Sequence, residues 1–213
     1  MDYRPRVFGW NEARDQWRFL GHELLLLIDR KPMRWLVFLF EPSAGVIISY
    51  RIDRSGYLLF GASWTALRIL LAPLTTFLAL WSCRHEICWK AEVGKGLRIM
   101  HPTLGIVIHG EAVVGENCVL IGGNSLGGRR PIRRGQLVLG DNVVLGIHSC
   151  VLGPVRIGNG VQIGAGAVVV HDLKDGAVAV GIPARAIGKK KERKTKKKRA
   201  DGRDKKREPL KGE

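Results

Sequence analysis

An aliphatic residue returns at every sixth position between Val93 and Val180, and a glycine often follows it. The longest unbroken run of this repeat is Leu139, Leu145, Val151, Ile157, Ile163 and Val169. A six-residue period is typical of parallel β-helices, in which each aliphatic side chain stacks on its equivalents in neighbouring coils. A sandwich of short strands would instead alternate polar and apolar residues. The sequence therefore predicts a mainly β solenoid, with the glycines turning its corners in conformations closed to other residues.

The region before the repeat has a helical pattern. Residues Trp10 to Arg30 predict an amphipathic helix, whose apolar face we expect to carry Trp17, Leu20, Leu24, Leu27 and Ile28. Residues 63–82 are almost entirely apolar, broken by Arg68 and Pro73. The arginine and the proline argue against a membrane span. Two alternatives remain open for this stretch: packing within a helical N-terminal domain, or peripheral contact with a membrane.

The region after the repeat is strongly basic. The chain has a net charge of +16, and the segment 189–213 holds 14 Lys or Arg against 5 Asp or Glu. Without apolar periodicity it cannot bury enough surface to fold, so we expect a disordered tail. Either an arm for anionic lipid or a solubilising extension fits this composition, and no specific nucleic-acid partner is expected. The sequence thus divides into a helical region at 1–85, a β-helix at 86–188 and a basic tail at 189–213.

The cysteines indicate a reducing compartment. Cys83, Cys88, Cys118 and Cys150 are scattered without a CxxC pair, which favours free thiols over a disulfide framework or a zinc site. The first residues lack the apolar core and cleavage site of a signal peptide. We therefore expect a cytoplasmic protein, with membrane association through 63–82 and the tail left open.

Four motifs resemble those of one enzyme family. The stretch from Val93 to Ile108 looks like the active-site coils of serine acetyltransferases and their saccharide-acetylating relatives. Ser125-Leu126-Gly127-Gly128, Ile163–Val169 and Gly181-Ile182-Pro183-Ala184-Arg185 are similar to further motifs of that family. The resemblance implies a left-handed β-helix that forms homotrimers or dimers of trimers. It also implies acetyl-CoA as co-substrate, held in a groove between adjacent prisms, and no metal.

The resemblance carries over to particular residues. His101 corresponds to the family's general base, which removes the proton of the acceptor hydroxyl so that the oxygen can attack a thioester. Glu86 stands where the family has an aspartate that orients the histidine or binds the acceptor. The resemblance places six residues at the acetyl-CoA groove, namely Gly127, Gly128, Gly164, Ala165, Arg185 and Lys189. At Gly164 and Ala165 a bulky side chain would obstruct the pantetheine arm.

Other polar residues have two readings each. Arg129 and Arg130 lie on a loop, 128–136, that interrupts the repeat, where they either bind an anionic group of the substrates or are simply solvated. His109 either borders the acceptor pocket or is a solvated corner residue. His148 is a groove-lining or surface residue in the favoured reading, and a second base in the other.

Two acceptors fit the sequence. L-serine, giving O-acetylserine for cysteine synthesis, is the acceptor that the family names first. However, the chain reads Arg129-Arg130-Pro131 where the family has a second histidine, and Met100 replaces an aspartate before the base. A sugar hydroxyl in exopolysaccharide or envelope synthesis is therefore the alternative. A hypothesis of another class is a non-catalytic β-helix scaffold.

Overall fold

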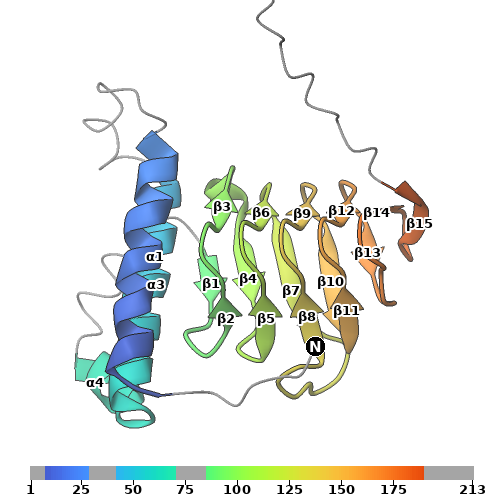
Figure 1. Ribbon diagram of the computed structural model, residues 1–213. Helices are drawn as coiled ribbons and strands as arrows, with labels where there is room; N and C mark the ends of the chain where they lie inside the picture. Colours follow the sequence, from blue (N-terminus) through green and yellow to red (C-terminus); the bar gives the residue numbers. More distant parts are fainter. Residues whose placement is uncertain (1–7, 29–41, 71–84, 190–213) are drawn as a thin grey trace, which may run out of the picture.

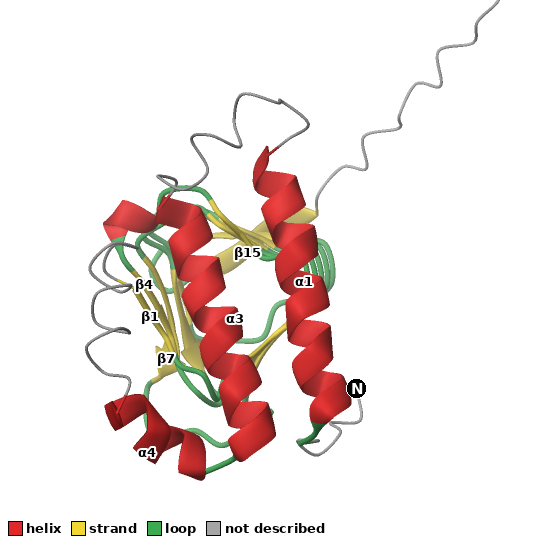
Figure 2. Ribbon diagram, turned by 90° about the vertical axis from the view of Figure 1, so that its left-hand side faces the viewer, coloured by secondary structure: helices red, strands yellow, loops and turns green. Residues whose placement is uncertain are grey.

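The computed structural model describes residues 8–28, 42–70 and 85–189, and it consists of a helical layer at one end of a β-solenoid (Figure 1). Helices α1 (Trp10–Ile28) and α3 (Pro42–Phe60) pack side by side across the first coil, and the shorter α4 (Ser63–Leu70) follows α3 (Figure 2). Within the described ranges, no helix combines the length and apolar character needed to cross a bilayer. Residues 71–82 of the apolar stretch and 190–213 of the basic tail lie outside the described residues.

The solenoid is a prism with three sheets. The first sheet contains β1 (His85–Ile87), β4 (Ile106–Ile108), β7 (Asn124–Gly128), β10 (Cys150–Gly153) and β13 (Val168–Val169). The second contains β2 (Glu92–Val93), β5 (Ala112–Val114), β8 (Leu137–Leu139) and β11 (Val155–Ile157). The third contains β3 (Arg98–Ile99), β6 (Val119–Leu120), β9 (Val144–Leu145), β12 (Gln162–Ile163), β14 (Ala177–Val180) and β15 (Arg185–Lys189). The coils pair in parallel, and among the described strands only β15 runs antiparallel to its neighbour. The predicted fold class is confirmed.

The aliphatic ladder forms the core. Each of the six aliphatic residues in the unbroken run from Leu139 to Val169 is at most 3% exposed. Equivalent residues of successive coils are direct partners in the sheets, as Leu139 with Ile157 and Val151 with Val169. Burying one such side chain stabilises the fold by about 1.5–3 kcal/mol. The stacking expected from the period is therefore the main source of the prism's stability.

The glycines after the aliphatic residues have a different role from the expected one. Gly115, Gly140 and Gly158 are not in the left-handed region of φ. A Cβ on Gly140 would overlap Oδ1 of Asn159 in the next coil, and that oxygen accepts a hydrogen bond from the Asp141 N–H at 2.8 Å. These glycines are required by the close approach of neighbouring coils, so the expectation that they turn the corners is wrong.

The inward face of α1 agrees with the predicted one except at Trp17, which is 53% exposed. Leu20 is buried, and Leu24 and Leu27 pack against the core as expected. The same face also carries the buried Gln16 and Glu23, which the apolar spacing could not indicate because they are polar. Gln16 and Glu23 face inward because they bind a buried arginine of α3.

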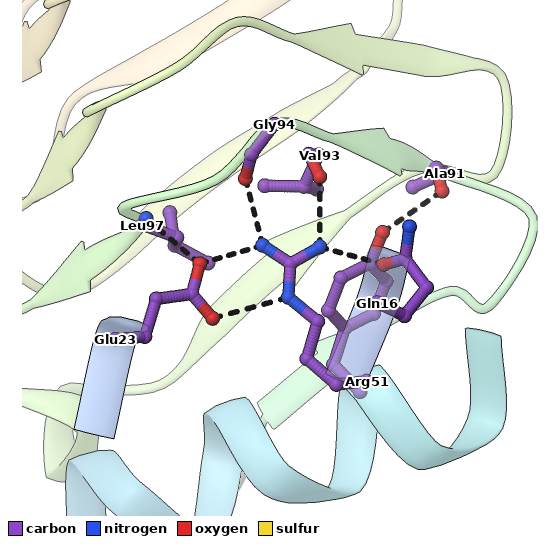
Figure 3. Close-up of polar contacts among 8 residues, drawn as sticks. Gln16, Glu23, Arg51, Ala91, Val93, Gly94 and Leu97 are labelled. Carbon is purple, nitrogen blue, oxygen red and sulfur yellow. Dashed lines mark hydrogen bonds and ion pairs between the residues drawn. The ribbon is translucent and has the colours of Figure 1, made fainter. Parts of the chain in front are cut away.

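That arginine, Arg51, joins the helices to the solenoid (Figure 3). Its side chain is 1% exposed and forms a two-pronged ion pair with Glu23 of α1, with N···O distances of 2.6 and 3.1 Å. Its remaining N–H groups donate to Gln16 Oε1, the Val93 oxygen and the Gly94 oxygen, at 2.7–2.8 Å. Arg51 thus supplies donors to carbonyls of the first coil, which no preceding coil could cover.

Candidate active site

His101 lies at a corner of the prism. It follows β3 and precedes a single 3₁₀ turn, Pro102–Leu104, through which the chain passes from the third sheet to the first. Its N–H donates to the Ile121 oxygen of the next coil at 2.9 Å, which fixes the backbone. The side chain is exposed, and its imidazole has no hydrogen-bond partner among the described residues. Both ring nitrogens are therefore available to a substrate.

The corners that connect the third sheet to the first stack into one edge, which we call the His101 edge and define as residues 100–105, 121–123, 146–149 and 164–167. Successive segments touch closely: a Cβ on Gly122 would lie 2.5 Å from the His101 oxygen, and one on Gly146 would lie 2.5 Å from the Ala165 nitrogen. A Cβ on Gly123 would overlap the imidazole of His148. The edge therefore brings His101, His148 and Ala165 to one side of the molecule.

A buried asparagine, which none of the sequence motifs includes, holds this edge in place. Asn124 is 1% exposed at an inward position of β7, where its partner on β4 is the aliphatic Ile106. Its Oδ1 accepts from the Gly122 N–H at 2.9 Å, and its Nδ2 donates to the Gly146 oxygen at 2.7 Å. Asn124 could have been found from the sequence, because it is a polar residue at a position where the ladder otherwise has aliphatic residues.

Glu86 lies, like His101, in the first coil, at the end of the prism that the helices cover. It is exposed on β1, in register with Val107 of β4. No hydrogen bond joins it to His101 within the described part of the chain, so its orienting role stays a prediction. Three apolar side chains in this region are also exposed: Met100 and Leu104 on the His101 segment, and Val107 on the neighbouring strand, at 43–46%.

The predicted acetyl-CoA residues are distributed along the prism. Gly127 and Gly128 lie on β7, and a Cβ on Gly127 would meet no atom within 4 Å, so Gly127 borders open space. Gly164 has an internal reason to be small, because a Cβ there would lie 2.8 Å from Cγ1 of Val180. Ala165 is exposed on the His101 edge.

Two further predicted residues of the groove lie at the far end. Arg185 is exposed on β15, which closes the prism opposite the helices. Lys189 is the last residue of β15, and its side chain lies outside the described part. Five strand steps separate β3 from β15, or about 24 Å at the usual strand spacing. The structure therefore does not gather Arg185 and His101 into one pocket of a single chain.

The loop 128–136 presents Arg129 and Arg130 to solvent. Ile132 anchors it, being 8% exposed, and Arg134 forms an ion pair with Glu92 of β2. The two outer arginines are thus held on an anchored loop. Their predicted contact with substrate remains a prediction.

His109 has a local role in the structure. It is exposed, and its Nδ1 accepts a hydrogen bond from the Glu111 N–H at 3.1 Å. This contact accounts for a histidine at that corner without a ligand, although it does not test the predicted place beside the acceptor.

The thiols and metal-ligating groups form no further centre in the described residues. Cys118 is completely buried, and burial raises the pKa of its thiol to about 11, so it is protonated at neutral pH. Cys88 and Cys150 are partly exposed free thiols. In the described ranges, no three His, Cys, Asp or Glu side chains are grouped closely enough to hold a metal ion.

Comparison with known proteins places this geometry among acyltransferases. Residues 137–171 match the family described as bacterial transferase hexapeptide (six repeats). The chain is 32% identical to a serine acetyltransferase of Helicobacter pylori over 174 residues, which cover 80% of this chain and 97% of that protein. It is 41% identical to a serine acetyltransferase of Synechococcus elongatus over 103 residues, 48% of this chain and 42% of that protein, so this match spans less than half of the longer relative.

Solved structures agree with the sequence comparison. A soybean serine acetyltransferase, solved in complex with serine, superposes with a TM-score of 0.67 at 25% identity. The superposition covers 83% of this chain and 71% of the soybean chain. The similarity therefore extends over nearly the whole described structure, helices as well as solenoid.

Proposed function

Because the chain belongs to the serine acetyltransferase family, we propose that it is an O-acetyltransferase that transfers the acetyl group of acetyl-CoA to the hydroxyl of L-serine. The observation that carries this proposal is His101, on the segment that resembles the family's active-site coils. Its imidazole is exposed and has no hydrogen-bond partner in the part of the chain that the structure describes. A scaffold would need the buried ladder but not an outward imidazole at this corner.

The proposed chemistry is a direct acyl transfer. His101 takes the proton of the serine hydroxyl while the oxygen attacks the thioester carbonyl, forming the new C–O bond. The tetrahedral intermediate then collapses, the C–S bond breaks, and the imidazolium returns its proton to the departing CoA sulfur. A backbone N–H of the glycine-rich coils would stabilise the negative oxygen of the intermediate. The thioester is already activated, so the step requires no metal and no acyl-enzyme.

We propose that the donor groove forms between neighbouring prisms of a homotrimer. The supporting observation is that His101 and Arg185 lie about 24 Å apart along one chain, while Gly127 borders open space. In this arrangement Gly127, Gly128 and Ala165 line the arm of acetyl-CoA, and Arg185 binds a phosphate. A trimer or a dimer of trimers would appear by light scattering as three or six times the 23.6 kDa chain.

One observation favours a second acceptor, a sugar hydroxyl. The surroundings of His101 include exposed Met100, Leu104 and Val107, and Glu86 is the nearby carboxylate on β1. The zwitterion of serine needs a partner for each of its charges, whereas the C–H face of a sugar ring can pack on apolar side chains.

The decisive experiment measures CoA release from acetyl-CoA, with L-serine and several nucleotide sugars assayed separately. Release with L-serine supports the first proposal, and release with a sugar alone replaces it by the second. His101→Ala should lower kcat by about 10²–10⁴ without unfolding the protein. His171→Ala is the matched control, since it removes an exposed imidazole at a corner after β13, away from the His101 edge, and should leave kcat within about threefold of wild type. If no acceptor releases CoA, or His101→Ala retains full activity, the proposed mechanism is wrong.

A further inference from the structure

His148 occupies a backbone position that its neighbouring coils give to glycine. Its φ is +56°, while Gly123 in the preceding coil and Gly166 in the following coil have φ of +65° and +64°. The three are equivalent corner residues, because the His148 N–H donates to the Gly122 oxygen just as the Gly166 N–H donates to the Ile147 oxygen. Residues with a Cβ are strained in this region, which glycine adopts freely. The backbone geometry at this corner favours glycine, so the presence of a histidine must be explained by its side chain.

Within the described residues, the fold gains no hydrogen bond that would explain this residue. The two backbone hydrogen bonds at this corner would be equally available to glycine. The His148 side chain is exposed, and its imidazole has no hydrogen-bond partner in the described part of the chain. What histidine adds at this position is an outward imidazole on the His101 edge.

Two glycines, Gly122 and Gly123, lie on the segment between the two histidines. Gly122 packs against the His101 oxygen, and Gly123 is so close to the His148 ring that a Cβ there would overlap Nδ1. The His101 and His148 corners are two coil steps apart, about 10 Å at the usual spacing. The two imidazoles thus stand on either side of a pair of glycines.

The surroundings limit how an acyl donor can reach His101. Helix α3 contacts the turn Pro102–Leu104 that follows His101, so the N-terminal end of the edge is covered. The thioester must come within bonding distance of a hydroxyl that itself touches the His101 ring. A long donor that enters along this edge therefore comes from the side of Ala165 and passes His148.

We propose that His148 is a positioning residue for the acyl donor, its imidazole hydrogen-bonding an amide group of the pantetheine arm between Ala165 and His101. This inference rests on the proposed function, because it takes acetyl-CoA as the donor. It assigns His148 no proton transfer in the reaction. The histidine acts by holding the arm in register with the acceptor.

The test is His148→Gly, which restores the residue found in the neighbouring coils and removes backbone strain. The variant should be as thermostable as wild type, or more so. Its Kd for acetyl-CoA by titration calorimetry, without acceptor, should rise about 5–10-fold, the loss of one hydrogen bond. The KM for acetyl-CoA should rise in parallel, with kcat within about threefold. His148→Asn, which tolerates this φ and keeps an amide donor, should recover part of the affinity.

Asn142→Gly is the matched control. Asn142 has φ of +57° at a corner between the second and third sheets, and its coil neighbour Gly160 has φ of +64°. The substitution makes the same backbone change away from the His101 edge, so the Kd for acetyl-CoA should not change.

Three outcomes would overturn the inference. Equal affinity of wild type and His148→Gly would show that the imidazole does not contact the donor. A loss of kcat with KM unchanged would place His148 in the chemical step instead. If wild type does not bind acetyl-CoA at all, the proposed function fails, and this inference fails with it.

Discussion

Replacing Arg51 with alanine should lower the free energy of unfolding by about 3–5 kcal/mol, the usual effect of removing one partner of a buried ion pair. The substitution deletes both contacts to Glu23, which is 1% exposed. Among the described residues, Glu23 would then retain only the hydrogen bond from the Leu97 N–H at 3.0 Å. It also leaves the Val93 and Gly94 carbonyls without their arginine donors. An uncompensated buried carboxylate is the largest contribution to the loss, because water cannot replace the guanidinium.

Urea unfolding followed by circular dichroism would measure this change as a lower midpoint at unchanged slope. In a thermal melt, about 3–5 kcal/mol corresponds to a fall in Tm of about 6–20 °C for a chain of this size. Arg18→Ala is the control, since the Arg18–Asp15 pair is 3.5 Å long with side chains 74% and 47% exposed. That variant should stay within about 0.5 kcal/mol of wild type.

A double substitution separates the ion pair from the rest. Glu23→Ala combined with Arg51→Ala removes both charges, so its cost should be smaller than the sum of the two single variants. If Arg51→Ala costs less than about 1 kcal/mol, or no more than Arg18→Ala, Arg51 does not join the helices to the first coil and the reasoning is refuted.

Three other perturbations test the site and the core. Gly127→Ala should leave Tm unchanged, because a Cβ there meets no atom within 4 Å. The same variant should bind acetyl-CoA more weakly if this surface lines the proposed groove. An unchanged affinity in calorimetry would remove Gly127 from the site. Gly164→Ala should instead lower the unfolding free energy by about 1–3 kcal/mol, since its Cβ would lie 2.8 Å from Val180, and an unchanged urea midpoint would contradict the packing. The folded pKa of Cys118, about 11, lies above its ordinary value of 9.0, so the associated stability is present below pH 9 and is lost as pH rises through 11. Urea midpoints measured at pH 8, 10 and 11 should therefore fall less steeply in Cys118→Ala than in wild type, and equal slopes would show that this thiol does not titrate as described.

The sequence predicted the prism well because the ladder has a physical period. Leu139, Leu145 and Val151 recur at the spacing of the sheets, and each is at most 1% exposed. The glycines beside them were misinterpreted, because a sequence does not reveal whether glycine serves a turn or the approach of another coil. At Gly140 the reason is Asn159 of the following coil, and the positive φ falls instead on residues such as Asn142.

The polar residues that hold the helices and the His101 edge in place were less predictable from the sequence. Arg51 binds Glu23, 28 residues earlier, and Val93, 42 residues later, and no local pattern indicates such partners. Asn124 could have been noticed as a polar residue at an inward position. His148 could be recognised from the pattern only as a histidine in a variable part of the repeat, and its importance rests on a backbone angle.

Closed ends determine the direction in which solenoids can associate. A bare terminal coil offers a row of unpaired N–H and C=O groups, and a second molecule could stack on it to begin a fibre. In this protein Arg51 occupies carbonyls of the first coil, and β15 reverses direction on β14 at the other end. Growth along the prism axis is thereby discouraged at both ends, which leaves the long lateral faces as the surfaces on which copies of the chain can meet.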